Sequence, residues 1–354
     1  MAKKLFIPGP VDVSSDVAAK MSEPMIGHRS EAFKTLYMDT LAKLKQLMYT
    51  QNTVIIAPSS STGLMEAAVR NCVKERCLNV INGAFSQRWH DITISNGKKA
   101  EKLEVEWGSA ATPEIVEEKL KTNEYDAMTI VHNESSTGVA TPLDGIAKVA
   151  KKYDVSLLVD TVSSLAGMKI EVDKLGLDVC LAGVQKCFAV APGITVCSIS
   201  NKALEKAKTI EDRGYYFDFL IYTKSLEKSQ TPTTPAIPQI KALNYQLDKI
   251  LNKEGLEHRF KRHREMADIT RKWAKKNFAM LPEDKFCSDT VSCIMNTRNL
   301  NLEEIKKKLS DTGYVFANGY GKLKDITFRI AHMGDRTVDE LKEYIEAIDG
   351  LIGC

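Results

Sequence analysis

The sequence has no run of apolar residues long enough to cross a membrane, which takes roughly 18 in succession. Its net charge of +3 over 354 residues is too small to favour binding to nucleic acid or to an anionic membrane. Two lysines stand near the N-terminus, but no apolar segment of signal-peptide length follows them. We therefore expect a cytoplasmic protein whose partners include neither nucleic acid nor a membrane.

Metal-binding and disulfide patterns are also missing. The eight cysteines include no C-x-x-C pair, and the six histidines show no spacing typical of metal ligands. Several cysteines stand in apolar, strand-like segments, which is typical of buried free thiols in a reducing compartment. We expect free thiols and no metal site.

Strand-like and helix-like segments alternate along most of the chain. This alternation is typical of an α/β domain in which a mostly parallel sheet has helices on both faces. The expected strands lie at 53–58, 77–83, 100–107, 126–136, 155–164 and 178–186. The expected helices lie between them at 62–73, 85–97, 112–121 and 142–154.

After about residue 235 the pattern changes. A long charged helical stretch at 238–278 is followed by two strand-like and two helical segments, which indicates a smaller α+β domain. Thr337 and Glu340 form a capping box that predicts the start of the last helix. We expect an N-terminal arm at 1–15, a large domain at 16–255 and a small C-terminal domain at 256–354.

Lys186 lies in the largely apolar, otherwise uncharged segment 181–193. A lysine is seldom buried unless it is paired with a carboxylate or its amine has a covalent task. Asp160 ends an apolar strand, where it can cap a helix or hold a protonated ring nitrogen. Because ligands bind at the carboxyl ends of parallel strands, we expect Asp160 and Lys186 to lie close together.

Ser60, Ser61 and Thr62 stand where a strand turns into a helix. The free N–H groups of a helix N-terminus can bind an anion there, although an N-cap with nothing bound explains the same residues. An anion cradle, a carboxylate and a buried lysine together are what pyridoxal 5'-phosphate (PLP) requires. The lysine would form a Schiff base with the aldehyde, and burial favours the neutral, nucleophilic amine.

The chain resembles the class V, fold-type I PLP-dependent aminotransferases. It is similar in particular to the alanine/serine–glyoxylate (serine–pyruvate) and archaeal-type phosphoserine aminotransferases. The likeness covers nearly the whole chain, and the matching motifs stand in the family's order. They are FIPGPVDVSSDV, GHRSEAF, NGAFSQRW, HNESSTGV, LLVDTVSS, GVQKCFAVAPG, TPTTPAIPQ and FRIAHMG.

The resemblance implies a role for each matching residue. The cofactor's phosphate would be contacted by Ser60, Ser61, Thr62 and Gln185. Its ring would stack on Phe85, contact Val162 and Ser135, and pair through its nitrogen with Asp160. Lys186 would form the Schiff base. Arg329 matches the arginine that holds the substrate's α-carboxylate with its planar fork. Thr234 matches a residue that reaches the phosphate from the partner subunit, which implies a homodimer with composite sites.

Two residues near the N-terminus bear on the identity of the substrate. In phosphoserine aminotransferases a pair like His28 and Arg29 helps to bind the substrate's phosphate, but glyoxylate- and pyruvate-using relatives carry similar residues, and Arg29 can also make structural hydrogen bonds at a dimer interface. We expect ping-pong transamination between alanine or serine and glyoxylate or pyruvate. The alternatives are phosphoserine:2-oxoglutarate transamination, a PLP lyase such as a cysteine desulfurase using Cys287 or Cys293, and a non-catalytic binding protein in which Lys186 is salt-bridged.

Overall fold

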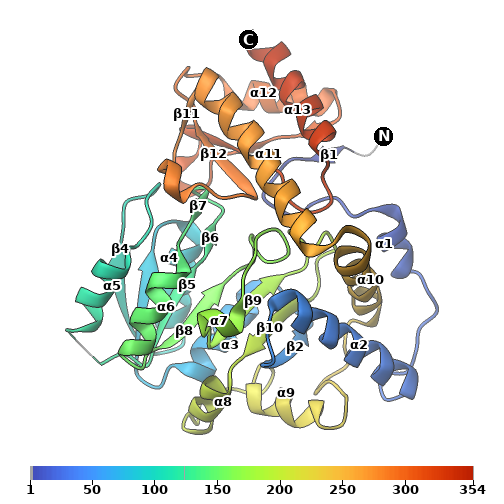
Figure 1. Cartoon of the computed structure of the whole chain (residues 1–354), viewed down its shortest axis with the longest axis vertical. Coiled ribbons are helices and arrows are strands. Elements are labelled where there is room, and N and C mark those ends of the chain that lie inside the picture. The colour runs from blue at the N-terminus through green and yellow to red at the C-terminus, as the bar shows by residue number, and fades with distance from the viewer. Residues whose placement is uncertain (1–2, 123, 354) are drawn as a thin grey trace.

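The computed structural model describes residues 3–122 and 124–353, and its largest element is a seven-stranded sheet (Figure 1). The strand order is β2-β10-β9-β8-β5-β3-β4. Every neighbouring pair is parallel except the two that β10 makes, so the predicted mostly parallel sheet is confirmed. The strands are β2 (Thr53–Ala57), β3 (Arg76–Ile81), β4 (Lys99–Glu104), β5 (Ala127–Val131), β8 (Ser156–Asp160), β9 (Val179–Gly183) and β10 (Thr195–Ile199).

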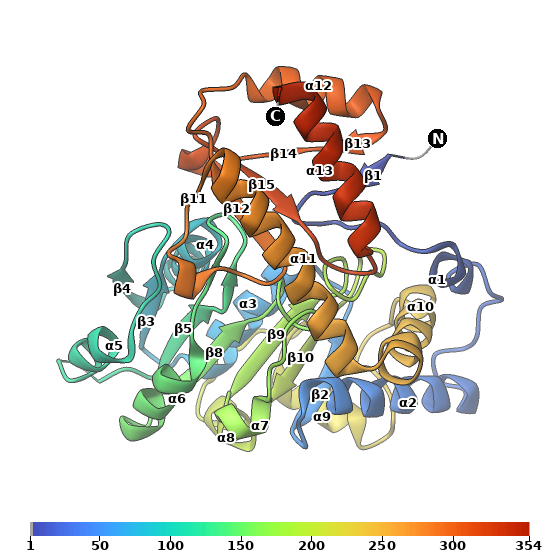
Figure 2. The ribbon, with the colours of Figure 1, turned by 45° about the horizontal axis from the view of Figure 1, so that its top comes forward.

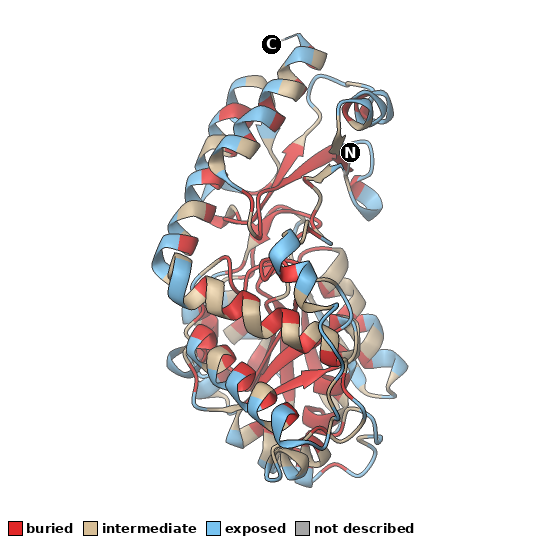
Figure 3. Cartoon of the chain, turned by 90° about the vertical axis from the view of Figure 1, so that its right-hand side faces the viewer, coloured by how far each residue is buried: buried red, intermediate tan, exposed pale blue. Residues whose placement is uncertain are grey.

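Helices cover both faces of this sheet, because successive side chains of a strand point to opposite faces. In β8, Leu157 and Val159 join one core and Leu158 joins the other. Figure 3 shows the buried strands enclosed by helices whose outer faces are exposed. The first core lies under α2 (Glu31–Met48), α5 (Pro113–Leu120), α6 (Leu143–Lys152) and α10 (Ile237–Asp248), and the second under α3 (Ser61–Cys72), α4 (Ala84–Ser95), α8 (Asn201–Lys208) and α9 (Phe219–Leu226).

A second, antiparallel sheet lies at the C-terminal part of the chain, in orange and red at the top of Figure 1. Its core contains Trp273, Phe328 and Tyr344. The capping box of the last helix is confirmed, since Thr337 and Glu340 each bond the other's backbone N–H. The strands are β11 (Ala279–Met280), β12 (Val291–Met295), β15 (Thr327–Ala331) and β14 (Ala317–Asn318), and the helices are α11 (Leu256–Asn277), α12 (Leu302–Asp311) and α13 (Val338–Ile352).

The helical stretch expected at 238–278 is helical almost throughout, but it is not one continuous α-helix. The chain forms α10, a π-helical turn at Lys249–Glu254, and then α11. Gly255 separates the last two with φ +81°, a left-handed conformation that glycine adopts at no steric cost. The expected boundary between the large and small domains falls at this glycine and stays a prediction.

The N-terminal arm is packed against the small sheet before it reaches the large one (Figure 2). β1 (Lys4–Leu5) pairs with β13 (Tyr314–Val315), and the Phe6 ring stacks on Tyr344 with the ring centroids 4.0 Å apart. Val11 then donates its N–H to the Gln185 carbonyl, next to Lys186. α1 (Ser15–Lys20) and α7 (Val172–Leu175) complete the helices of the large part.

No helix among the described residues is long and apolar enough to cross a membrane. Within the same residues, no group of three or more His, Cys, Asp or Glu side chains could hold a metal ion. Seven cysteines are free thiols, and Cys354 lies outside the described part of the chain.

Candidate active site

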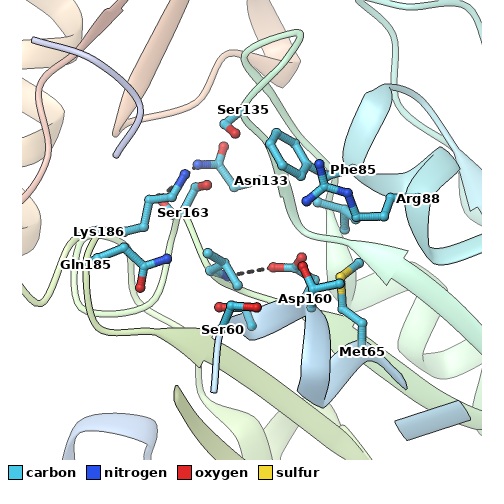
Figure 4. Close-up of a pocket in the computed structure, with 14 residues that line it drawn as sticks. Ser60, Met65, Phe85, Arg88, Asn133, Ser135, Asp160, Ser163, Gln185 and Lys186 are labelled. Carbon is cyan, nitrogen blue, oxygen red and sulfur yellow. Dashed lines mark hydrogen bonds between the residues drawn. The ribbon is translucent and has the colours of Figure 1, made fainter. Parts of the chain in front are cut away.

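A cavity of about 200 Å³ opens where the carboxyl ends of the large sheet's parallel strands meet (Figure 4). This edge is where α/β folds bind ligands. Predicted site residues from five separate segments of the sequence meet here. The lining comprises Ser60, Ser61, Thr62, Met65, Phe85, Arg88, Val131, Asn133, Ser135, Asp160, Val162, Ser163, Gln185 and Lys186.

Lys186 follows β9 and is 8% exposed. Burial lowers the pKa of its amine to about 8, because desolvation disfavours the ammonium more than the nearby Asp160 favours it. The amine donates to the carbonyl of Pro8, and Gly9 lies against the lysine's methylenes. A Cβ on Gly9 would lie 2.6 Å from Lys186 Cδ, so only glycine fits there. Sequence reasoning treated these two residues as part of an arm and missed their contact with the lysine.

Asp160 is the last residue of β8 and is 5% exposed. Its Oδ1 accepts the N–H of Val162 at 2.7 Å, and its Oδ2 has no hydrogen-bond partner among the described residues. Burial raises the pKa of this carboxyl to about 7, because desolvation of the carboxylate outweighs the opposite effects of the Val162 N–H and of Lys186. A cationic partner at Oδ2 would favour the carboxylate.

The N-terminus of α3 forms a polar cradle. Ser60 is the N-cap, but its side chain makes no capping hydrogen bond. The Ser61 hydroxyl is buried and finds no hydrogen-bond partner in the described part of the chain. Gly183 leaves the space between Ser61 and Gln185 open, because a Cβ there would collide with Ser61 Oγ and come within 2.7 Å of Gln185 Oε1. Hydroxyl and N–H donors therefore face a gap suited to an anion.

Glu134 positions the start of α4, which carries Phe85. Its Oε2 accepts the N–H groups of Phe85 at 3.0 Å and Ser86 at 2.9 Å, and its Oε1 accepts the Ser136 hydroxyl at 2.6 Å. Gly83 is required beside this carboxylate, since a Cβ would collide with the Glu134 side chain. Glu134 stands within the NESS motif, but the sequence did not indicate this role.

Arg329 lies on β15, beside the cavity but outside its lining. Its Nε and Nη2 donate to the Asn318 carbonyl at 3.1 and 3.0 Å, and Nη1 donates to the Ser135 carbonyl at 3.2 Å. A guanidinium has five N–H groups, so two remain for a ligand. The Tyr320 ring lies between the Arg329 guanidinium and Phe85, with 5.4 Å between the two ring centroids.

His28, Arg29 and Thr234 do not reach the cavity of their own chain. Arg29 and Thr234 are exposed, and Arg29 Nη1 donates to the Thr231 carbonyl at 2.8 Å. Cys287 and Cys293 also lie outside the lining, and burial raises the pKa of both thiols. Cys187, next to the lysine, is fully buried and donates to the Ser163 carbonyl at 3.3 Å.

Comparison with known proteins gives the family. The profile of the class V aminotransferases matches residues 12–319. The chain belongs to this family. An uncharacterized aminotransferase of Methanocaldococcus jannaschii is 39% identical over 94% of this chain and 88% of its own length. A serine–glyoxylate aminotransferase of Hyphomicrobium methylovorum is 33% identical over 93% of this chain and 84% of its own length.

A solved structure shows the same fold. The alanine–glyoxylate aminotransferase from Nostoc sp. superposes with a TM-score of 0.95 at 24% identity, over 99% of this chain and 96% of that one. The predicted fold class is therefore confirmed, and this class V aminotransferase is a transaminase that uses PLP.

The cavity of this class V aminotransferase fits PLP. The unpartnered Ser61 hydroxyl and the gap at Gly183 suit the phosphate, and the unpartnered Oδ2 of Asp160 suits a protonated ring nitrogen. Phe85 and Val162 both line the cavity and offer apolar surface to a ring. Lys186 has its amine in the same cavity, so the donor set matches the cofactor's chemistry.

Replacing Gly83 by Ala should weaken PLP binding at least tenfold, because the added Cβ displaces Glu134 and with it the backbone of Phe85. Equilibrium titration with PLP measures this effect. Gly350→Ala is the control, since a Cβ at this helical position meets nothing within 4 Å. Equal PLP affinity in wild type and Gly83→Ala would contradict the role given to Glu134.

Replacing Asp160 by Asn should lower the pKa of the Lys186 amine below about 8, because the Asp160 carboxylate favours the ammonium. The pH dependence of Lys186 acetylation in the cofactor-free chain, read by mass spectrometry, measures this pKa. Acetylation of the exposed Lys148 on the same chain serves as the internal reference for the reactivity of the reagent at each pH. A midpoint that stays in place or moves upward refutes this electrostatic coupling.

Proposed function

We propose that the enzyme transfers the amino group of a small L-amino acid, alanine or serine, to glyoxylate or pyruvate. Lys186 and Asp160, buried in one cavity with the polar cradle of α3, carry the proposal for transamination. Support for the substrates comes from the relative in Hyphomicrobium methylovorum, which is named a serine–glyoxylate aminotransferase. Donor and acceptor take turns in the same site, so the kinetics are ping-pong.

Each site residue has one task in this proposal. When bound, PLP supplies an electrophilic carbon and a conjugated ring that accepts the electron pair left at the substrate's Cα. Ser60, Ser61, Thr62 and Gln185 hold its phosphate, Phe85 and Val162 cover its ring, and Ser135 makes a polar contact. Asp160 accepts the ring N–H, and Lys186 moves the proton from Cα, since its lowered pKa makes a neutral amine accessible.

His28, Arg29 and Thr234 act across a dimer in this proposal. Thr234 is exposed and Arg29 bonds the Thr231 carbonyl, so both lie on a surface available to a second chain. We infer a homodimer in which this surface completes the partner's cavity, with Thr234 at the phosphate and His28 and Arg29 near the substrate. Sedimentation at micromolar concentration should give a dimer.

The donor is identified by adding L-alanine, L-serine, L-phosphoserine and L-aspartate singly to the PLP-loaded enzyme and recording the visible spectrum. We expect alanine or serine to remove the absorbance band, and glyoxylate or pyruvate to restore it. If phosphoserine is by far the best donor, the substrate proposal is wrong and phosphoserine:2-oxoglutarate transamination replaces it. A Lys186→Ala protein with an unchanged band would remove the basis of the whole assignment.

Replacing Arg329 by Gln should lower kcat/KM for the donor roughly 10²-fold, about 3 kcal/mol, because two charge-assisted hydrogen bonds to the α-carboxylate are lost. Steady-state kinetics with the best donor measure the change. Arg264→Gln is the control, since Arg264 is exposed and pairs with Asp289 away from the cavity. A change of less than threefold in kcat/KM would exclude Arg329 as the carboxylate-binding residue.

A further inference from the structure

The chain segment that carries Lys186 belongs to no helix or strand. β9 ends at Gly183 and β10 begins at Thr195, so a connection of irregular structure holds the lysine. Within it, Ala189 has φ +55° and donates its N–H to the Lys186 carbonyl at 2.9 Å. A left-handed conformation is unfavourable for alanine and persists only where the surroundings hold it.

A buried arginine from the small-domain side holds this connection. Arg259 of α11 is 1% exposed, and its Nη2 donates to the Cys187 carbonyl at 2.6 Å. Its Nε donates to the carbonyl of Ala166 at 2.9 Å, and Ala166 also has a positive φ, +69°. One guanidinium therefore joins the lysine-bearing turn to the turn that follows β8 and Asp160. In Figure 2, α11 runs from the small sheet down to the loops at the edge of the large one.

Two carboxylates keep Arg259 charged in this buried place. Its Nη1 donates to Glu254 at 2.6 Å, and its Nη2 donates to Asp335 at 3.1 Å. Burial alone would lower the pKa of Arg259, but Asp335 and Glu254 outweigh burial and raise it. Glu254 ends the π-helical turn just before α11, and Asp335 precedes α13. The arginine therefore connects its own helix to three distant residues, Ala166, Cys187 and Asp335.

We propose that Arg259 is a positioning residue for Lys186: by holding the Cys187 and Ala166 carbonyls, it keeps the lysine-bearing turn folded and the amine inside the cavity. The inference rests on the proposed function in that Lys186 is the reacting amine. Arg259 does not line the cavity, so it acts through the turn and makes no contact with substrate or cofactor there.

The titration of Lys186 reports whether the turn is in place. Its pKa is low because the amine is buried, and the charged or titratable groups that act on it are Asp160, Cys187, Arg329 and Glu134. If the turn loosens, the amine gains solvent and its pKa rises toward 10.5. A lysine at position 259 keeps the positive charge but lacks the planar fork that bonds two carbonyls at once.

The test compares Arg259→Lys with Arg271→Lys in the full chain freed of PLP, by the pH dependence of Lys186 acetylation. Arg271 is a matched control: it is on the same helix and also donates to two carbonyls, of Cys287 and Ser288, and to a carboxylate. We expect a midpoint near pH 8 in wild type and Arg271→Lys, and a midpoint about one unit higher in Arg259→Lys.

A second readout uses the PLP-loaded enzyme. Arg259→Lys should lower kcat roughly tenfold and leave KM for the donor nearly unchanged, because a misplaced amine slows proton transfer and does not contact the donor's carboxylate. Should Arg259→Lys not fold, Asp335→Asn replaces it. That variant keeps Arg259 but weakens the contact at Nη2, and should move the midpoint in the same direction.

Two results would overturn the proposal. One is a Lys186 midpoint in folded Arg259→Lys, or in its substitute Asp335→Asn, equal to that of wild type. The other is an equal rise in Arg259→Lys and Arg271→Lys, which would mean general loosening of α11. The labelling needs neither cofactor nor substrate, so failure of the proposed function, seen as no response to any amino donor, is distinguishable from failure of this inference.

Discussion

Burial of the Lys186 amine is the constraint on which the site depends. An ammonium group loses its hydration in such a cavity, so its pKa falls to about 8 and a neutral amine becomes accessible. The same burial raises the pKa of Asp160 to about 7. Desolvation therefore makes the pKa values of Lys186 and Asp160 similar. A cationic ring nitrogen beside Asp160 would lower the pKa of Asp160 again and favour its carboxylate.

Three separate parts of the chain maintain that burial. The large sheet supplies Asp160 and Lys186 at neighbouring strand ends, since β8 and β9 are parallel neighbours. Pro8 and Gly9 of the N-terminal arm cover the lysine. Arg259 of α11 donates to the Cys187 carbonyl in the turn that carries Lys186. The arm is itself anchored in the C-terminal part of the chain, since β1 pairs with β13 and the Phe6 carbonyl accepts the N–H of Ala331 in the small sheet. Relative movement of the two sheets would therefore act directly on the lysine.

Much of the site was predictable because its residues stand in short motifs beside strand ends. Ser60, Phe85, Ser135, Asp160 and Lys186 all line the one cavity, as the motifs and the parallel-sheet rule indicate. The parallel strands were also predictable from their apolar runs, but β10, which pairs antiparallel with β2 and β9, was not among the expected strands. The break of the long helix at Gly255 was missed, because a charged helical pattern continues on both sides of that single residue.

The sequence by itself determined the class of chemistry, the residues at the strand ends and the mostly parallel sheet, because each of these depends on residue types close together in the chain. Only the tertiary structure decided that Glu134 holds Phe85, that Pro8 accepts from Lys186 and that Arg259 supports the lysine's turn. In each of these contacts, one of the two partners is a backbone N–H or carbonyl group. Every residue carries such a group, so residue types alone do not indicate which one an arginine, a lysine or a carboxylate will bond.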